Sequence, residues 1–323
     1  MLIDARVSLV IPILNERTVL PELLTAIENQ TLRPHEIIFV DAGSTDGSKE
    51  YIESWWLRSS WDGGLCKVLS KPGAMPGAGR NIGIRSASYE WIAFLDAGIT
   101  AEPLWLEELC RVADYDKNPA VLGTCQFMGS RSFEKAICAL SYGQGQIHAV
   151  LPVSLFHRSV FDRVGWFRPE LRAGEDILWQ TQARRVMGNR VICNAAIGHY
   201  KHFPSSLAQA FRKWQVAEFH CVMAGVRRMQ IPFYLIVLPG LYFFLFVGGF
   251  LGSALYMLYI LWRAVITPMR RSAMLRWWGE TPGGFWIPFW LAPSLDIAKF
   301  AGIIRGLLHI CATFPKGRKI WNG

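Results

Sequence analysis

Short apolar segments recur along the first two hundred residues and alternate with stretches that have helical periodicity. In residues 17–30, Val19, Leu23 and Ile27 recur at every fourth position, which is the spacing of one helix face. Five runs rich in branched or aromatic residues predict strands, at residues 7–11, 36–40, 66–69, 91–95 and 190–194. Strands that alternate with helices predict an α/β fold, with a mostly parallel sheet and helices on both faces.

Three polar loops follow predicted strands at their carboxyl ends. They are PILNE at residues 12–16, DAGSTDGS at residues 41–48 and DAGIT at residues 96–100. In open parallel sheets, ligands bind at the loops that leave the carboxyl ends of the strands. All three loops carry acid or amide groups and the second is rich in glycine, so we expect a polar ligand site at this edge.

The chain also contains a long segment without charge, residues 231–262. As one helix this segment would measure ~48 Å, whereas the hydrocarbon core of a bilayer is ~30 Å thick. Basic residues flank it on both sides, namely Arg227, Arg228, Arg263, Arg270, Arg271 and Arg276. A hairpin that turns near Gly248 and Gly249 keeps both flanks in the cytoplasm, as the positive-inside tendency favours. A single span, a shallow or re-entrant hairpin and a buried core helix are the alternatives.

The last segment has the pattern of an interfacial helix. Its apolar stripe is made by Ile297, Phe300, Ala301, Ile304, Leu308 and Cys311, with Lys299, Arg305 and His309 opposite. We therefore predict four regions: an α/β domain at 1–205, an amphipathic interface helix at 206–230, a hydrophobic membrane hairpin or span at 231–266, and a basic loop with an interfacial helix at 267–323. The N-terminal apolar run follows Asp4 and contains Pro12, so we interpret it as a core strand and not as a signal peptide.

Composition supports a soluble part joined to a membrane part. Charged residues make up 18% of the 323 residues, apolar residues make up 51%, and the net charge is +9. A basic excess suits an anionic membrane surface or phosphate-bearing substrates. Nucleic acid is not expected as a partner, because no dense basic stripe with interleaved aromatic residues is present. The seven cysteines form no C-x-x-C pair or zinc spacing, so we expect them to be buried thiols.

Two acidic stretches carry candidate chemistry. Asp41 ends a predicted strand and Asp46 follows in a turn rich in glycine and serine, where carboxylates suit a nucleobase or ribose and open amides suit a phosphate. An ordinary Asp-Gly turn is the alternative. Glu175 and Asp176 precede an apolar helical run, where one carboxylate can act as a base, or where both can simply favour a helix N-terminus.

Four stretches occur in the order of the motifs of one enzyme family. They are VSLVIPILNE from residue 7, EIIFVDAGSTDGS from residue 36, GAGRNIGIRSASYEWIAFLDAG from residue 77 and VGWFRPELRAGEDILWQTQARRVMG from residue 164. Together they resemble glycosyltransferase family 2, whose members are inverting enzymes with the GT-A fold. The resemblance implies a UDP- or GDP-linked sugar donor, a hydroxyl on a lipid-linked or saccharide acceptor, and Mg²⁺ or Mn²⁺. With the hydrophobic segment, it implies polysaccharide synthesis for the cell envelope, at the cytoplasmic side of the cell membrane.

The resemblance also assigns roles to individual residues. Donor contacts fall to Pro12, Asn15, Glu16, Asp41, Arg80, Asn81 and Asp96, the catalytic pair is Glu175 with Asp176, and the metal ligands are Asp96 and His199, with His202 as a rival to His199. Asp176 is the expected base. Gly98 stands where the D-x-D motif of the family has its second acid. Positive charge from Arg80 and Lys71 is therefore the alternative to a metal ion.

Two further readings of the function stay open at this point. The first is a polyprenyl-phosphate glycosyltransferase, in which the acceptor is the lipid phosphate itself. The second is an inactive subunit that binds sugar nucleotides, since the metal motif is incomplete. The intact Glu175–Asp176 pair speaks against inactivity.

Overall fold

The computed structural model describes residues 6–59, 61, 63–188, 190–280 and 284–313. The chain divides into two compact units. Unit 1 comprises residues 1–126, 147–171 and 175–201, and unit 2 comprises residues 127–146, 172–174 and 202–323. The second unit therefore takes two short segments from within the region 1–205, which the sequence pattern treats as one continuous domain.

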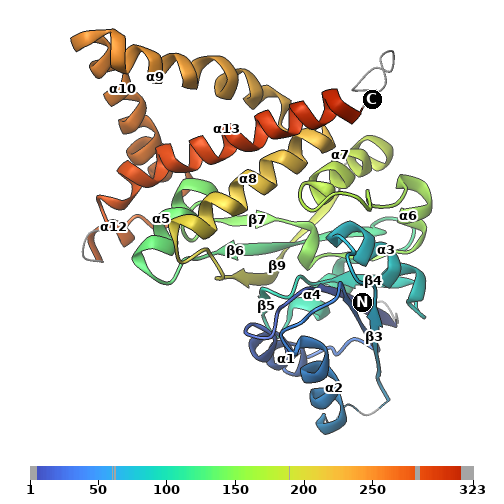
Figure 1. The fold of residues 1–323 in the computed structure, drawn as a ribbon. Helices are drawn as coiled ribbons and strands as arrows, with labels where there is room; N and C mark the ends of the chain where they lie inside the picture. Colours follow the sequence, from blue (N-terminus) through green and yellow to red (C-terminus); the bar gives the residue numbers. More distant parts are fainter. Residues whose placement is uncertain (1–5, 60, 62, 189, 281–283, 314–323) are drawn as a thin grey trace. The chain divides into compact units, whose positions relative to one another are not determined.

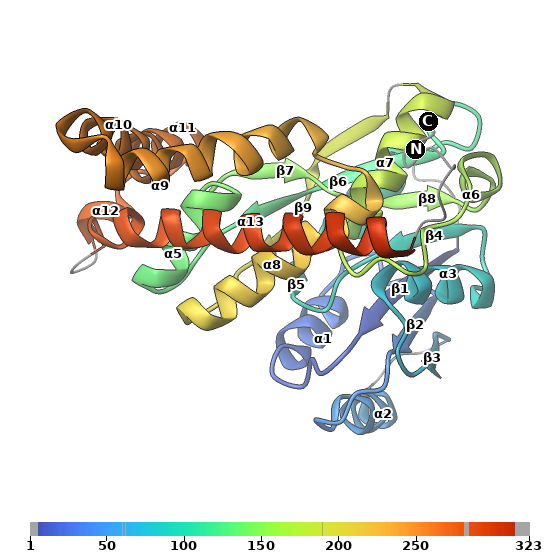
Figure 2. The ribbon, with the colours of Figure 1, turned by 45° about the horizontal axis from the view of Figure 1, so that its top comes forward.

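A nine-stranded mixed sheet runs through the first part of the chain. Its strands are β1 Val7–Ile13, β2 Glu36–Asp41, β3 Leu65–Ser70, β4 Trp91–Phe94, β5 Ile99–Ala101, β6 Ala120–Phe127, β7 Ile147–Ala149, β8 Leu155–His157 and β9 Val191–Tyr200. The order is β3-β2-β1-β4-β8-β6-β9-β5, and β7 pairs with β6. The strands β3, β2, β1 and β4 are parallel and lie side by side in Figure 2, whereas β8 joins β4 in antiparallel fashion. The α/β prediction is confirmed, and these four strands form a parallel part of the sheet.

Helices connect and cover the strands of unit 1. They are α1 Leu20–Glu28, α2 Ser48–Arg58, α3 Pro76–Ser86, α4 Trp105–Val112, α6 Ser159–Val164 and α7 Glu175–Met187, with the short η1 Leu151–Val153. Helix α3 packs directly on β1, because Gly83 has no side chain there. A Cβ atom at Gly83 would lie 2.2 Å from Cγ1 of Val10. This close packing fixes α3 beside the carboxyl end of the central strands.

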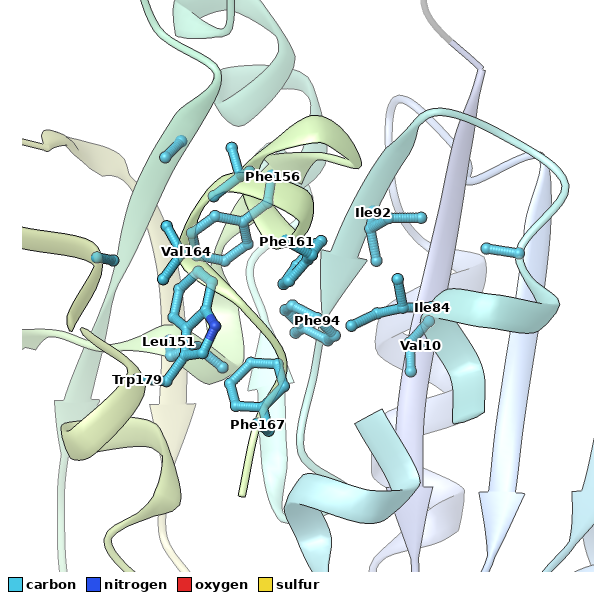
Figure 3. Close-up of a cluster of buried hydrophobic side chains, with 14 of the residues drawn as sticks. Val10, Ile84, Ile92, Phe94, Leu151, Phe156, Phe161, Val164, Phe167 and Trp179 are labelled. Atoms are coloured by element: carbon cyan, nitrogen blue, oxygen red, sulfur yellow. The ribbon is translucent and has the colours of Figure 1, made fainter. Parts of the chain in front are cut away.

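An aromatic cluster forms the core next to the parallel strands. Phe94 of β4, Phe156 of β8, Phe161 of α6 and Trp179 of α7 are almost completely buried in it, together with Phe167. Figure 3 shows these rings grouped between the strands and the two helices. The Phe167 and Trp179 rings stack with their centroids 5.0 Å apart. The start of α7 is therefore held to the sheet by its own tryptophan.

Unit 2 is helical. Its helices are α5 Ser132–Ser141, α8 Leu207–Ala224, η2 Arg228–Gln230, η3 Phe233–Val237, α9 Leu238–Val247, α10 Gly249–Leu261, η4 Trp262–Ile266, α11 Thr267–Arg271, α12 Trp277–Glu280 and α13 Ile287–Thr313. Helix α13 runs alongside α8 (Figure 2). Gly302 and Gly306 permit the close approach, since a Cβ atom on Gly302 would lie 2.4 Å from the carbonyl oxygen of Gln215.

The uncharged segment forms two helices that meet at Gly248 and Gly249, where the sequence predicts the turn (Figure 1). The helical stretches Arg228–Val247 and Gly249–Arg271 are long and apolar enough to cross a membrane, and only 11% and 28% of their apolar windows are buried. Phe246 and Phe250 beside the turn are 81% and 91% exposed. A core helix of a soluble protein would be mostly buried, so this exposure favours a membrane partner. Membrane attachment stays a prediction, because length and apolar composition alone define these two helices.

Only part of the predicted stripe on the last helix is exposed, because Phe300 packs against the buried apolar cluster of unit 2. Ile297 and Leu308 of α13 are exposed, whereas the face with Leu295, Ala298 and Gly302 is buried. The face against α8 is therefore a different one from the apolar stripe seen in the sequence. Ile297 and Leu308 stay available for an apolar partner, as the interfacial pattern predicts.

Candidate active site

Arg80 is the centre of the candidate site. It lies in α3 with only 2% of its surface exposed. One guanidinium nitrogen lies 2.6 Å from Oδ1 of Asp96, and the other lies 2.7 Å from Oε1 of Glu175. These two acids, with Asp176 nearby, raise the pKa of Arg80 further above its ordinary value, although burial opposes this shift. Asp96 and Glu175, which the sequence assigns to separate motifs, are thus joined by one buried cation.

The acidic pair opens helix α7. Glu175 is the first residue of the helix and is 5% exposed, and Asp176 follows it. Burial raises the pKa of both carboxyl groups above their ordinary values, while the charge of Arg80 opposes that rise. Carboxylates with raised pKa values in a buried site are suited to accept a proton.

The position of the pair depends on the aromatic core. Trp179 lies one turn after Glu175 and donates its indole N–H to the carbonyl oxygen of Gly165 at 2.7 Å. Gly77 of α3 approaches the same region, because a Cβ atom there would lie 3.3 Å from Cγ of Glu175. Packing around α7 therefore leaves little room for Glu175 to move.

Asn81 has a supporting place beside Arg80. Its amide nitrogen donates to the carbonyl oxygen of Phe167 at 2.9 Å, and its oxygen accepts from the Phe167 N–H at 3.1 Å. The nitrogen and the oxygen of the Asn81 amide thus both bind the backbone of Phe167, in the segment that leads to α7. These bonds hold Asn81 to Phe167, and the contact of Asn81 with the donor stays a prediction.

The loops after β1 and β2 are bound to each other. Asn15 has a left-handed backbone with φ of 57°, and its side-chain oxygen accepts from the Thr45 N–H at 2.8 Å. The Glu16 N–H donates to Oγ of Ser48 at 2.9 Å. Asp41 is 3% exposed at the end of β2, and its Oδ1 accepts from the Ser44 N–H at 3.0 Å. These bonds make one rigid polar rim from two loops.

The remaining donor candidates join the same edge. Pro12 in β1 faces α3, because a Cβ atom on Gly79 would lie 3.2 Å from its Cβ. The backbone N–H of Lys71 donates to the carbonyl oxygen of Asp41 at 2.7 Å, and its side chain is exposed. The carboxyl edge of the parallel strands thus carries the residues that the sequence assigns to the donor.

The metal candidates form a partial donor set. Within the described residues, no group of three His, Cys, Asp or Glu side chains is arranged to hold a metal ion. Arg80 binds one oxygen of Asp96, but the Asp96 side chain is still 41% exposed. A single exposed carboxylate suits Mg²⁺ or Mn²⁺ when substrate oxygens and water complete the coordination. The residues present therefore fit an ion that binds together with a diphosphate.

The side chain of His199 pairs with an acid that lies outside the motifs. Its Nε2 lies 2.9 Å from Oε1 of Glu102, and β9, which carries it, pairs with β5. His202, the rival candidate, belongs to unit 2. Glu102 was not singled out by sequence reasoning, because it lies outside every motif. The antiparallel pairing of Thr100 with His199 is the feature that brings it close, and a sequence pattern does not reveal that pairing.

Comparison with known proteins finds glycosyltransferases among the similar sequences. The profile of Glycosyl transferase family 2 matches residues 8–163. The putative glycosyltransferase EpsH of Bacillus subtilis (strain 168) is 26% identical over 223 residues, which cover 64% of this chain and 64% of that protein. The chain thus spans slightly less than two thirds of that relative. Glycosyltransferase AglE of Haloferax volcanii is 27% identical over 237 residues, covering 69% of this chain and 77% of AglE.

Solved structures support the fold. The mannosyltransferase PcManGT of Pyrobaculum calidifontis, solved with GDP-Man and Mn²⁺, has a TM-score of 0.60. The match covers 94% of this chain and 88% of PcManGT. Its sequence identity is 17%, so the likeness concerns the fold alone. The matched residues 8–163 contain the rim of β1 and β2, Arg80 and Asp96. Over this segment, slightly less than half of the chain, the protein matches glycosyl transferase family 2.

Proposed function

We propose that the protein is an inverting glycosyltransferase that moves a sugar from a nucleotide-sugar donor to a hydroxyl group of a lipid-linked or saccharide acceptor. The observation that carries this proposal is the buried Arg80, which joins Asp96 to Glu175 at 2.6 and 2.7 Å. Donor-side and acceptor-side motifs of the family meet at this one residue. The family match and the named glycosyltransferase relatives support the same activity.

Asp176 acts as the base in this proposal. The acceptor oxygen attacks C1 of the sugar from the face opposite the diphosphate, and the acceptor proton passes to the Asp176 carboxylate. The new C1–O bond forms as the bond from C1 to the diphosphate oxygen breaks, so the configuration at C1 inverts. Glu175 remains paired with Arg80 and orients the site. The raised pKa of Asp176 makes it a stronger proton acceptor than an ordinary carboxylate.

The joined loops after β1 and β2 would hold the nucleoside of a UDP- or GDP-linked donor. Asn15, Glu16 and Asp41 lie on loops that bind each other, so their positions are fixed before the donor arrives. Preorganised polar groups lose less freedom on binding, which favours affinity. PcManGT was solved with GDP-Man, which supports a nucleotide-sugar donor for the fold.

Asp96 would hold a divalent cation together with the donor diphosphate. When bound, Mg²⁺ or Mn²⁺ neutralises the negative charge that develops on the leaving diphosphate. Mn²⁺ accompanies the ligand in PcManGT and in GalNAc-T7, which supports this cofactor. Arg80 bonds to one oxygen of Asp96, and the exposed part of this carboxylate would hold the cation.

The hairpin of α9 and α10 would attach the protein to the cell membrane with the catalytic residues on the cytoplasmic side. The exposed apolar residues of both helices and the flanking arginines support this arrangement. An enzyme held at the membrane meets lipid-linked acceptors there. Synthesis of polysaccharide for the cell envelope is the process that we assign to it.

Replacement of Asp176 tests the base. Asp176→Asn keeps the shape of the side chain but removes proton acceptance, so turnover should fall by about 10² or more while donor binding is retained. Turnover and nucleotide-sugar binding are measured with a panel of UDP- and GDP-sugars. Asp162→Asn on the exposed side of α6 is the control and should leave turnover unchanged. Near-normal turnover in Asp176→Asn would remove Asp176 from this role, and donor binding without turnover in the native protein would favour an inactive subunit.

Replacement of Arg80 tests its charge through the pH profile. Arg80 lowers the pKa values of Glu175 and Asp176, so Arg80→Gln should raise both. The base is active only as the carboxylate, hence the acidic limb of the pH–rate profile should move to higher pH. Arg85→Gln, at the exposed end of the same helix, should leave the limb in place. An unchanged limb in Arg80→Gln would show that the cation does not act on the base.

Metal removal tests the role of Asp96. With one carboxylate, metal affinity should be weak without donor and stronger once the diphosphate contributes oxygens. Chelator should abolish turnover, and Asp96→Ala should remove the effect of Mn²⁺ on nucleoside diphosphate binding, measured by calorimetry. Gly98→Asp restores the second acid and should lower the Mn²⁺ concentration needed. Full turnover in chelator, with normal donor binding by Asp96→Ala, would instead assign the positive charge to Arg80 and Lys71.

A salt wash of membranes tests the hairpin. Apolar burial is not screened by salt, so the protein should stay in the membrane fraction at about 1 M NaCl, where the Debye length is only ~3 Å. A variant with Phe246→Glu and Phe250→Glu should move to the soluble fraction, because it exposes charge at the turn. Leu57→Glu is the matched control, since Leu57 of unit 1 is 85% exposed. Release of the native protein by salt alone would contradict the hairpin anchor.

A further inference from the structure

A buried polar cluster lies between the hairpin and α13 in unit 2. Asp296 of α13 is fully buried, and both of its oxygens bind the Arg263 guanidinium, at 2.6 and 2.7 Å. The hydroxyl groups of Tyr259 and Tyr234 donate to the same carboxylate at 2.9 and 3.4 Å. A buried carboxylate with this many donors is fully compensated, so this part of the cluster is complete in itself.

A second pair extends the cluster toward α8. Glu218 of α8 is 3% exposed and accepts a hydrogen bond from Arg227 at 3.1 Å. Glu218 also lies against α13, because a Cβ atom on Gly302 would be 3.1 Å from its Cβ. Arg227 has a left-handed backbone with φ of 58°, which is strained for a residue with a side chain. The packing therefore keeps an arginine at a position where glycine would be less strained.

Lys299 is the fifth charged residue of the cluster. It lies on α13 between Asp296 and Gly302, and its Nζ is 6.0 Å from the centre of the Tyr234 ring. Burial lowers the pKa of Lys299 to about 8, Asp296 opposes that shift and Arg263 adds to it. Glu218 and Arg227 also act on this charge.

The charges of the cluster do not balance. Three cations, Arg227, Arg263 and Lys299, face two carboxylates, Glu218 and Asp296, which leaves an excess of one positive charge. Arg227 and Arg263 each have a carboxylate of their own. The excess charge thus falls on Lys299, which is half-buried and poorly solvated. An anion that reached this position would relieve the repulsion from Arg263 and restore solvation to the ammonium group.

We propose that Lys299, assisted by Arg227, binds the phosphate group of a membrane lipid. A phosphate supplies the missing negative charge and strong hydrogen-bond acceptors. The hairpin of the same unit exposes apolar side chains that suit a hydrocarbon chain, among them Phe243, Phe246 and Leu258. Arg263 remains with Asp296 and fixes the face of α13 on which Lys299 lies.

The lipid has two possible sources with the same head-group chemistry. It is either a phosphate-linked isoprenoid that serves as the acceptor, or an anionic phospholipid of the bilayer. The acceptor reading rests on the proposed transferase function, whereas lipid binding itself does not. Binding and turnover are therefore measured separately.

The experiment uses the full chain in detergent, with farnesyl phosphate, farnesol and inorganic phosphate as probes in calorimetry. Loss of one charge-assisted contact weakens binding by about 10-fold or more, so Lys299→Gln should reduce farnesyl phosphate affinity by that factor. Lys299→Arg should retain most of the affinity. Arg305→Gln on the same helix is the control and should change it less than about twofold, because Arg305 is exposed and lies over the Phe219 ring.

Native protein gives a second test that needs no variant. The affinity for farnesyl phosphate should decrease as the pH rises past about 8, where Lys299 loses its proton. The charged and titratable neighbours that face Lys299 are Asp296, Arg263, Glu218, Arg227 and Tyr234. An affinity that is constant through this range, or unchanged in Lys299→Gln, would overturn the proposal.

The other probes distinguish the sources. Farnesol should bind with no dependence on Lys299, and equal affinity for inorganic phosphate and farnesyl phosphate would overturn the lipid part of the proposal. Displacement of farnesyl phosphate by phosphatidylglycerol vesicles would identify the phospholipid head group, whereas glycosylation of farnesyl phosphate would identify the acceptor. Lys299→Gln should still bind nucleotide sugar, and Asp176→Asn should still bind farnesyl phosphate, so failure of one proposal is separable from failure of the other.

Discussion

The buried guanidinium of Arg80 is the interaction on which the candidate site depends. A cation without water is very unfavourable unless anions surround it, so Arg80 requires both Asp96 and Glu175 at hydrogen-bond distance. This requirement links α3, the loop after β4 and the first turn of α7. Phe167 lies beside the guanidinium, with its ring centre 5.8 Å away, and also stacks on Trp179. Charge and aromatic packing therefore hold the same three segments together.

The site keeps an excess of negative charge even with Arg80 in place. Asp96, Glu175 and Asp176 are three carboxyl groups against one guanidinium, and burial raises the pKa values of the last two. Such an imbalance favours a cation beside Asp96, whose side chain is the most exposed of the partners of Arg80. It also favours proton uptake by Asp176. The same electrostatic imbalance would favour both the proposed metal ion and the proposed base.

The sequence predicts local features well and long-range pairings poorly. The apolar runs locate β1, β2, β3 and β4 closely, because parallel strands buried on both faces leave continuous hydrophobic segments. The short strands β5, β7 and β8 have no such signal, and their antiparallel pairing depends on contacts between distant residues. For the same reason the motifs identify Arg80, Asp96 and Glu175 individually, but they do not predict that Arg80 pairs with both acids. The Glu102–His199 pair and the cluster around Asp296 have no local signal either.

The chain passes from unit 2 back to unit 1 immediately before the acidic pair. Residues 172–174 belong to unit 2, and Glu175 follows them directly in unit 1. Gly174 has φ of 79°, and a Cβ atom there would lie 3.3 Å from Sγ of Cys221 in α8. The Arg172 N–H donates to Nδ1 of His220 in the same helix. Helix α8 also carries Glu218 of the buried polar cluster around Asp296. Contacts with α8 therefore hold Gly174, the residue that directly precedes the acidic pair, within unit 2.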